Sequence, residues 1–265
     1  MRSIILVLLQ NKLTLTHIIS YITKSSILMA SDTRVSDIEI KENSYGDSSR
    51  YFADCGRKTF LLKPYNIGIS FFGSGYFQDL NSEAETLLPI AYFLPGFTKN
   101  LKEEDSISVT AQKIVDNIKQ ISTWEKCKED VFLSGFIAGI KDNVASFISF
   151  NTCYNKVAIV DNVEPGNCFE KNEKEIRNCL YSDERLKAID IINEKMIAEN
   201  LMHPFEVGGP TDILEVLPEG RSKWLFESPH ITDEEKIMYA SYPNELYNIL
   251  KLDKLKSNRY NLTLY

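Results

Sequence analysis

Residues 16–22 (THIISYI) and residues 27–34 (ILMASDTR) carry the strongest signal in this chain, because they read as two short apolar strands joined by a tight connection. Thr16 opens the first strand. Asp32 follows sixteen residues later, just past the end of the second strand, and Arg34 follows two residues after it. A Thr at the start of a strand becomes a nucleophile once the peptide bond before it is cut, because its freed α-amine then serves as the base.

This pattern, a Thr followed after sixteen residues by Ala-x-Asp-x-Arg, resembles the N-terminus of proteasome β-type subunits, which are N-terminal-nucleophile (Ntn) hydrolases. A second similar block has Lys58 opening one strand and a Gly ending the next, residues 66–73. A third is the turn at residues 208–213 (GGPTDI), followed by Trp224. The resemblance covers residues 16–226 in the expected order.

The resemblance implies an α+β fold, a four-layer αββα sandwich of the Ntn-hydrolase type, for residues 16–228. We expect residues 1–15 to be a leader or propeptide, an extra edge strand, or the product of a start codon upstream of the true one. Residues 229–265 exceed the usual core, and we expect them to form a helical C-terminal extension.

The resemblance also implies catalytic roles. Thr16 would be the nucleophile, and Lys58 would hold its amine unprotonated by positive potential. Asp32 would pair with Lys58 and fix its position, and Arg34 would extend this network. Alternatively, Thr16 would be a β-branched residue in an edge strand and Lys58 a solvated residue at a strand start. Asp32 and Arg34 would then lie in a surface turn after a strand. Arg57 leaves the register of the lysine uncertain by one residue.

Two residues of the second block would complete the site. Gly73 would offer its backbone N–H to the oxyanion, or would simply be a glycine at a helix entry. Phe71 would line the pocket for the substrate side chain, or would pack in the core. Leu15 precedes the nucleophile where the family commonly has Gly or an initiator Met, and Thr14 is a rival nucleophile. The late Asp and two Ser residues of the family have no clear counterpart here.

Composition excludes several other classes. The 265 residues carry a formal charge of −7 without a basic run, which argues against nucleic-acid binding. Five cysteines without a C-x-x-C pair indicate neither a disulfide framework nor a zinc site, so we expect no metal or cofactor and a cytoplasmic location. The apolar run at residues 4–9 is too short to span a membrane.

The remaining patterns predict the other elements. Strands are expected at 16–22, 26–31, 58–63, 66–72, 131–140, 143–150, 155–160, 211–217 and 222–227, and helices at 75–93, 107–121, 183–201 and from 232 to about 255. Residues 35–57 are expected to be a surface loop. In the helix at 183–201 the side chains expected to face inward are Leu186, Ile189, Ile192, Met196 and Leu201.

Three functional hypotheses follow. The first is a threonine-type peptide or amide hydrolase that acts through an acyl-enzyme. The second is a catalytically inactive subunit with a scaffold role, and the third is a small-molecule amidase on the same fold. The resemblance alone implies a homo-oligomeric ring and a regulatory ATPase as a candidate partner, with no nucleic acid and no membrane.

Overall fold

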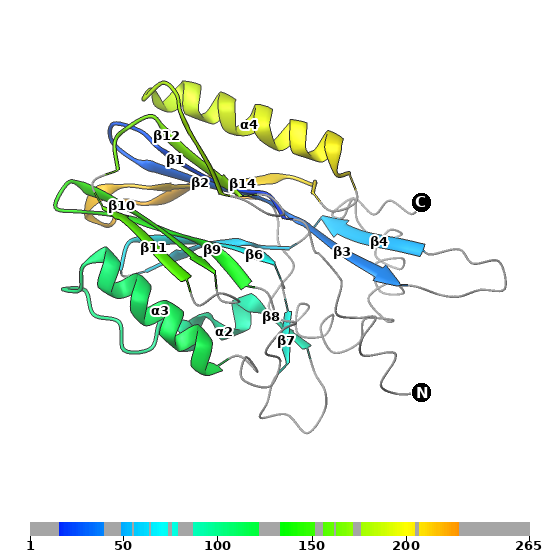
Figure 1. Cartoon of the computed structure of the whole chain (residues 1–265), viewed down its shortest axis with the longest axis horizontal. Coiled ribbons are helices and arrows are strands. Elements are labelled where there is room, and N and C mark those ends of the chain that lie inside the picture. Colours follow the sequence, from blue (N-terminus) through cyan, green and yellow to red (C-terminus); the bar gives the residue numbers. More distant parts are fainter. Residues whose placement is uncertain are drawn as a thin grey trace.

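The computed structural model describes residues 16–39, 49–54, 56–63, 65–73, 76–78, 87–121, 133–151, 156–161, 163–171, 176–204 and 207–227. In these ranges the protein is mostly β-sheet, with three α-helices (Figure 1). The predicted leader at 1–15 and the predicted helical extension at 229–265 lie outside them. Among the described residues no helix is both long and apolar enough to cross a membrane.

The first sheet has six antiparallel strands in the order β13-β12-β1-β2-β14-β15. Their bounds are Ile176–Leu180, Asn167–Lys171, Ile18–Ile22, Ile27–Asp32, Thr211–Val216 and Lys223–Phe226. The two central strands β1 and β2 are buried along their whole length. A strand covered on both faces reads as a continuous apolar run, which explains their composition.

The second sheet has five antiparallel strands in the order β11-β10-β9-β6-β5. Their bounds are Lys156–Asp161, Val144–Asn151, Leu133–Lys141, Ile67–Gly73 and Thr59–Leu62. Strands β9, β10 and β11 form the meander that the apolar runs between 131 and 160 predicted. Strand β6 pairs with β9 and so joins this meander to the hairpin of β5 and β6.

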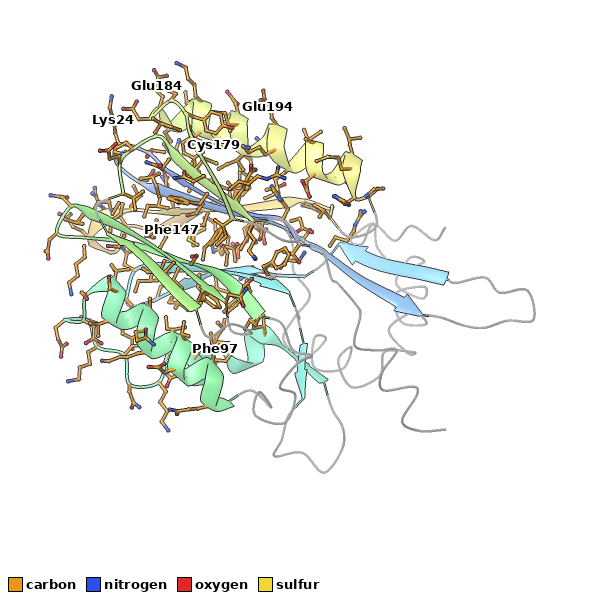
Figure 2. All side chains as sticks on the ribbon, in the orientation of Figure 1. Lys24, Phe97, Phe147, Cys179, Glu184 and Glu194 are labelled. Carbon is orange, nitrogen blue, oxygen red and sulfur yellow. The ribbon has the colours of Figure 1, made fainter. Side chains whose placement is uncertain are left out.

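Three apolar clusters hold these elements together. The inter-sheet cluster contains Met29 and Leu214 of the first sheet and Phe136 and Phe147 of the second, and Figure 2 shows Phe147 between the sheets. Gly68 on β6 faces this cluster, and a Cβ there would collide with the Met29 sulfur. The absence of a side chain at this position therefore lets the two sheets approach closely.

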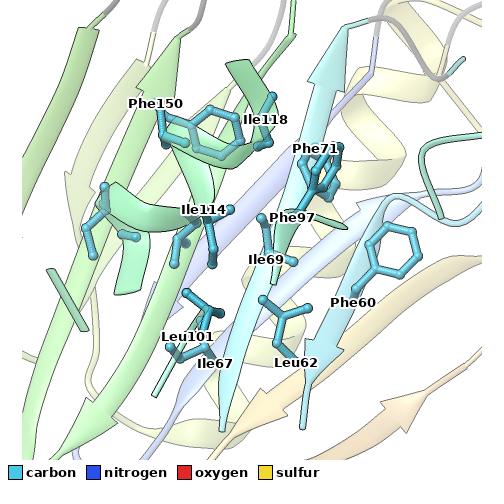
Figure 3. Packing of buried hydrophobic residues seen from close by; sticks show 14 of the residues in the cluster. Phe60, Leu62, Ile67, Ile69, Phe71, Phe97, Leu101, Ile114, Ile118 and Phe150 are labelled. Carbon is cyan, nitrogen blue, oxygen red and sulfur yellow. The ribbon is translucent and has the colours of Figure 1, made fainter. Parts of the chain in front are cut away.

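The two outer clusters attach the helices. One contains residues of β6 together with those of helices α2 (Ile90–Phe97) and α3 (Ile107–Ile121), and Figure 3 shows its interdigitated side chains. The other contains Ala188, Ile192 and Met196 of helix α4 (Arg185–Met202) with residues of β1 and β2. Helix α4 thus covers one sheet, and α2 and α3 cover the other.

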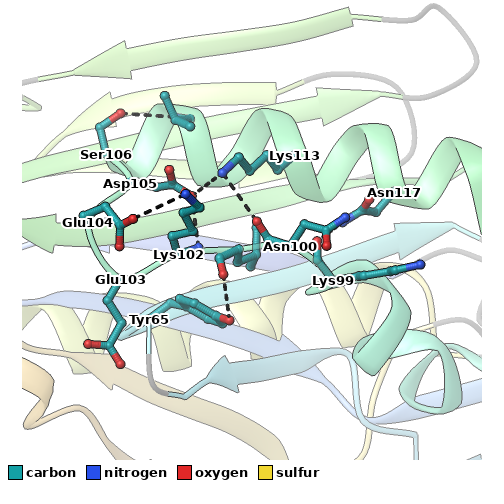
Figure 4. A network of polar contacts seen from close by, with 12 residues as sticks. Tyr65, Lys99, Asn100, Lys102, Glu103, Glu104, Asp105, Ser106, Lys113 and Asn117 are labelled. Carbon is teal, nitrogen blue, oxygen red and sulfur yellow. Dashed lines mark hydrogen bonds and ion pairs between the residues drawn. The ribbon is translucent and has the colours of Figure 1, made fainter.

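A polar network fixes the connection between α2 and α3 (Figure 4). Lys113 of α3 donates to Asp105 at 2.6 Å, and this contact lowers the pKa of the Asp105 carboxyl. Lys141, at the end of β9, donates to the carbonyls of Glu103, Glu104 and Asp105. The connection is thereby tied to both α3 and the second sheet.

Several sequence predictions of local structure were wrong. The stretch 75–93 is not one helix, because β7 (Tyr76–Gln78) pairs with β8 (Leu87–Pro89) and α2 begins only at Ile90. The stretch 35–57 is not simply a loop. Strands β3 (Arg34–Glu39) and β4 (Ser49–Asp54) form a ribbon that projects from the sheets in Figure 1. Strands β12 and β13 were not predicted at all.

The inward face of α4 was also partly misassigned. Leu186 and Leu201, which were expected inside, are 71% and 78% exposed. Ala188 and Glu199 are buried in their place, together with Ile192, which was expected there. The helix has apolar residues on both sides, so its periodicity alone does not single out the buried face.

Candidate active site

The centre of the candidate site is the carboxylate of Asp32, at the end of β2 and 2% exposed. The Lys58 ammonium lies 2.9 Å from its Oδ1 and 2.8 Å from its Oδ2. The backbone N–H of His17 donates to Oδ1 at 3.1 Å. The N–H groups of Arg34 and Gly208 donate to Oδ2 at 3.2 and 3.3 Å. The buried carboxylate therefore has a counter-charge and three backbone donors.

Burial and these contacts act on the titration of Asp32 in opposite directions. Burial raises the pKa of the Asp32 carboxyl above its ordinary value, whereas the Lys58 ammonium and the N–H groups of His17 and Gly208 oppose the rise. Because an unpaired buried carboxylate is costly, the ion pair with Lys58 and the backbone donors are what keep a charge tolerable here.

Thr16 lies directly beside this carboxylate. It precedes β1 and is 4% exposed. The N–H that donates to Asp32 Oδ1 belongs to the peptide unit joining Thr16 to His17, and the same oxygen accepts from Lys58. The structure thus brings the Thr16 peptide, Asp32 and Lys58 together, although they lie far apart in sequence.

Arg34 extends the network mainly through its backbone. Its guanidinium donates to the Pro204 carbonyl and lies so close to Gly208 that a Cβ there would meet Arg34 Cζ at 2.5 Å. Thr33 adds two contacts to the same turn, from its N–H to the Gly208 carbonyl and from its Oγ1 to the Pro210 carbonyl. The glycine-rich turn is therefore held against the junction of β2 and β3.

The structure resolves the choice between Arg57 and Lys58. Arg57 pairs with Glu227 at 2.5 Å, and its guanidinium lies 5.3 Å from the ring centre of Trp224. Lys58 is the residue that reaches Asp32.

Gly73 and Phe71 lie near the end of β6 but differ in surroundings. Gly73 is the last residue of the strand, with a φ of 107°, and β7 rather than a helix follows it. Its role as oxyanion donor stays a prediction. Phe71 is 4% exposed, and its ring packs against Phe60, Phe97 and Phe150. Its contacts are those of core packing, and nothing among the described residues supports a pocket-lining role.

Sequence reasoning missed a hydroxyl cluster beside the ion pair. Thr59 Oγ1 donates to Ser31 Oγ at 2.9 Å and lies 2.8 Å from Ser70 Oγ. All three residues are fully buried. The signal was present in the sequence, because small hydroxyl residues interrupt three otherwise apolar strands at positions that pair in space.

His17 is a second feature that the sequence did not reveal. It is 2% exposed, and neither ring nitrogen has a hydrogen-bond partner in the part of the chain that the structure describes. Burial lowers its pKa to about 4, with smaller influences from Glu170, Lys195 and Lys58. The imidazole is therefore neutral at pH 7.

The described residues include no cluster of three or more His, Cys, Asp or Glu side chains able to hold a metal ion. The described cysteines, Cys168 and Cys179, are free thiols.

Comparisons with known proteins show no family for this chain. No family model matches it, and no curated protein matches it. Among solved structures it is similar to a Gly-1 mutant of Anbu from Hyphomicrobium sp. strain MC1, with 12% identity, 92% of this chain and 98% of that chain covered, and a TM-score of 0.48. It is also similar to the helical assembly of the Anbu complex from Pseudomonas aeruginosa, with 13% identity, 89% and 96% coverage, and a TM-score of 0.49.

These findings correct the family assignment drawn from Thr16, Asp32 and Arg34. The assignment to proteasome β-type subunits was wrong: no family model supports it, and the two similar solved structures named above are Anbu proteins.

Proposed function

We propose that this protein is an amide hydrolase whose nucleophile is the hydroxyl of Thr16, freed as the N-terminal residue by removal of residues 1–15. The observation that carries the proposal is the shared acceptor Asp32 Oδ1. It binds both the Lys58 ammonium and the peptide unit that follows Thr16. Asp32 thereby holds the Lys58 ammonium beside Thr16, and a nearby positive charge favours the neutral form of the Thr16 amine.

The proposed reaction needs no group beyond the chain and water. The neutral α-amine accepts the proton of the Thr16 hydroxyl as Oγ1 attacks the substrate carbonyl. The N–H of Gly73 donates to the oxyanion of the tetrahedral intermediate. The proton passes to the leaving amine as the C–N bond breaks, and an ester on Thr16 remains. Water, deprotonated by the same amine, hydrolyses this ester and releases the acid.

We also propose that the sheets and helices form the four-layer αββα sandwich expected from the sequence. The three apolar clusters support this arrangement, since one lies between the sheets and each of the others lies between a sheet and its helices. The order of layers would be α4, the first sheet, the second sheet, and α2 with α3. Thr16 and Asp32 then lie at the ends of strands β1 and β2.

A scaffold without catalytic activity is the second candidate, and two observations favour it. Thr16 is 4% exposed in the full-length chain, and Leu15 precedes it where a self-cleaving precursor of this type commonly has Gly. An uncleaved Thr16 has no free amine and hence no base of its own.

Intact-mass spectrometry before and after exposure to a peptide epoxyketone, a threonine-directed electrophile, separates the two candidates. The hydrolase is expected to lack residues 1–15 and to gain one inhibitor mass. Thr16→Ala is expected to gain none, whereas the control Thr98→Ala, in the connection after α2, is expected to react like the wild type. An unprocessed chain without adduct would support the scaffold, and equal labelling of Thr16→Ala would exclude this nucleophile.

The substrate class is decided by a second measurement. Turnover of fluorogenic peptides without turnover of small acyl amides supports a peptidase, and the reverse result supports a small-molecule amidase. A homo-oligomeric ring and a regulatory ATPase remain predictions for the assembled protein.

A further inference from the structure

Lys171 is a buried lysine on the strand next to β1. It is the last residue of β12 and lies directly opposite Ile18 in the antiparallel pairing. Ile18 and Phe169 both contribute to the inter-sheet cluster. Because paired and alternate residues share a face of the sheet, Lys171 also points between the sheets. It is 5% exposed.

The Lys171 side chain crosses from the first sheet to the second. Its Nζ lies 5.0 Å from the ring centre of Phe72 on β6. A cation over an aromatic face at this distance is attracted by the ring, so Phe72 helps to hold the ammonium. Phe72 is the neighbour of Gly73, the predicted oxyanion donor. The ammonium therefore lies close to the same end of β6 as the proposed site.

The pairing of β1 with β12 also places Lys171 near Thr16. Thr16 lies two residues before Ile18, which is the direct partner of Lys171. Diagonal neighbours on antiparallel strands lie within reach of long side chains. Lys171 thus lies on the β12 side of Thr16, whereas Lys58, which directly precedes β5, pairs with Asp32 of β2 on the other side of β1.

We infer that Lys171 is a second cation of the Thr16 site, which acts with Lys58 to keep the liberated α-amine of Thr16 in its neutral, proton-accepting form. This inference rests on the proposed function. Lys171 is a positioning residue in this role, because it acts through the amine and takes no part in bond making.

The charges around the amine explain why a second cation matters. Both Asp32 oxygens contact the Lys58 ammonium, so the carboxylate offsets much of the field of that cation. Asp212 of β14 lies opposite Ser31 and adds a second buried carboxyl on the inter-sheet side. The neighbouring His17 is neutral at pH 7 because burial lowers its pKa to about 4. Of these groups, only Lys58 and Lys171 oppose protonation of the amine.

Two further charged groups lie on the other side of the first sheet. Glu170 and Lys195 form an ion pair at 2.9 Å, and each offsets the other. Burial lowers the pKa of Lys171 itself, so its charge is lost at a lower pH than that of an exposed lysine. Lys171 is therefore expected to affect the amine at acid and neutral pH, where the lysine carries its charge.

The test measures the rate of epoxyketone addition to the processed protein as a function of pH, by intact mass. The range from about pH 5 to about pH 9 brackets the ordinary α-amino pKa of about 7.7–8.0. In Lys171→Met the midpoint of the profile is expected to rise by about one pH unit, which lowers the rate about tenfold on the acid side. The rate at the alkaline plateau is expected to be retained.

Three variants control this result. Lys171→Arg keeps the charge and is expected to keep the wild-type midpoint, and Lys24→Met removes an exposed lysine and is expected to change nothing. Lys171→Gln replaces the Met variant if that protein does not fold, which circular dichroism reports. A merely structural role would lower the rate equally at all pH values.

The outcomes separate this inference from the proposed function. A wild-type protein that forms no adduct overturns both. A wild-type protein that reacts, combined with an unchanged midpoint in a folded charge-removing variant, overturns the role of Lys171 alone. A raised midpoint in Lys171→Met or Lys171→Gln that Lys171→Arg restores supports it.

Discussion

At the scale of single residues, Asp32 is the position on which the site depends. Its carboxylate receives one ammonium and three backbone N–H groups while being almost completely buried. Loss of one partner of a buried carboxylate is strongly destabilising, because the remaining charge lies in the protein interior, which solvates it poorly. The contribution of these partners can be measured as a change in the free energy of unfolding, whether or not the protein is catalytically active.

Lys58→Met is expected to destabilise the fold by about 3–5 kcal/mol, because it leaves the buried carboxylate of Asp32 without its counter-charge. Urea unfolding measures the change. The control is Lys24→Met, which breaks the exposed pair with Asp183 and is expected to cost at most about 1 kcal/mol. The double variant Lys58→Met with Asp32→Asn should recover part of the loss. Equal effects of the two single variants would show that the Asp32 pair is no more important than a surface contact.

His17 gives a pH prediction. Its pKa in the folded protein is about 4, below the ordinary value of 6.5, because the ring is buried. Between these values the unfolded chain binds more protons, so the free energy of unfolding falls as the pH is lowered from 6.5 to about 4. The expected contribution is roughly 3 kcal/mol.

Urea unfolding at pH 7 and near pH 4 measures this loss in the wild type, in His17→Gln and in the control His203→Gln. The loss should be smaller in His17→Gln, which cannot titrate, and unchanged in His203→Gln, whose side chain is 36% exposed. An identical loss in His17→Gln would assign the acid sensitivity to other groups.

At the scale of elements, two consecutive contacts join β2 to the start of β5 and the residue before it, and thereby one sheet to the other. Asp32 pairs with Lys58, and Ser31 accepts a hydrogen bond from Thr59. Ser70 of β6 adds a third hydroxyl. Thr59→Val keeps the shape of the side chain but removes the hydroxyl, so the two serines lose a buried partner.

We expect Thr59→Val to lower the free energy of unfolding by about 1–3 kcal/mol, because buried polar groups without a partner keep their full desolvation cost. Thr59→Ser retains the hydroxyl and serves as the matched variant. Chemical denaturation compares the two. A valine variant at least as stable as the serine variant would show that the hydroxyl cluster contributes nothing to joining the sheets.

Elements with one buried face could be predicted from the sequence, and elements without one could not. Helix α3 has its observed bounds because Ile107, Ala111, Ile114 and Ile118 recur at helical spacing and are all buried. Strand β13 has every side chain exposed and therefore no alternation to detect. In the stretch 75–93 the apolar pattern suggested one helix, but Pro89 ends a strand, and the helix starts directly after it.

The site was predictable to the extent that its residues lie on adjacent strands. Thr16 and Asp32 come from one hairpin, so their spacing in sequence carries the signal. Lys58 follows soon after and was placed by resemblance. Lys171 was missed because it lies beside β1 only through the pairing of β1 with β12. These two strands are far apart in sequence, so no local sequence pattern predicts the pairing.

At the scale of the whole molecule, helix α4 presents an apolar outer surface. Ile197 and Leu201, one turn apart, are 61% and 78% exposed. Burying a side chain of this kind in an interface contributes about 1.5–3 kcal/mol. If the predicted homo-oligomer uses this surface, charged residues here should disrupt it without unfolding the chain.

Sedimentation velocity tests this expectation. The double variant Ile197→Glu with Leu201→Glu is expected to shift the protein toward the monomer while its thermal unfolding midpoint stays close to the wild-type value. The same substitution at the exposed Val109 of α3 is expected to leave the sedimentation coefficient unchanged. A double variant that sediments like the wild type would exclude α4 from the interface.

The position of β1 has a consequence for biosynthesis. This strand lies between β2 and β12, and its partner Lys171 is synthesised long after the hairpin of β1 and β2. A nascent polypeptide on the ribosome can form the β1–β2 hairpin but cannot complete the sheet around it. If Thr16 is freed as proposed, this step would follow the synthesis of β12, so that a reactive amine and hydroxyl would not be exposed before the sheet around them is complete.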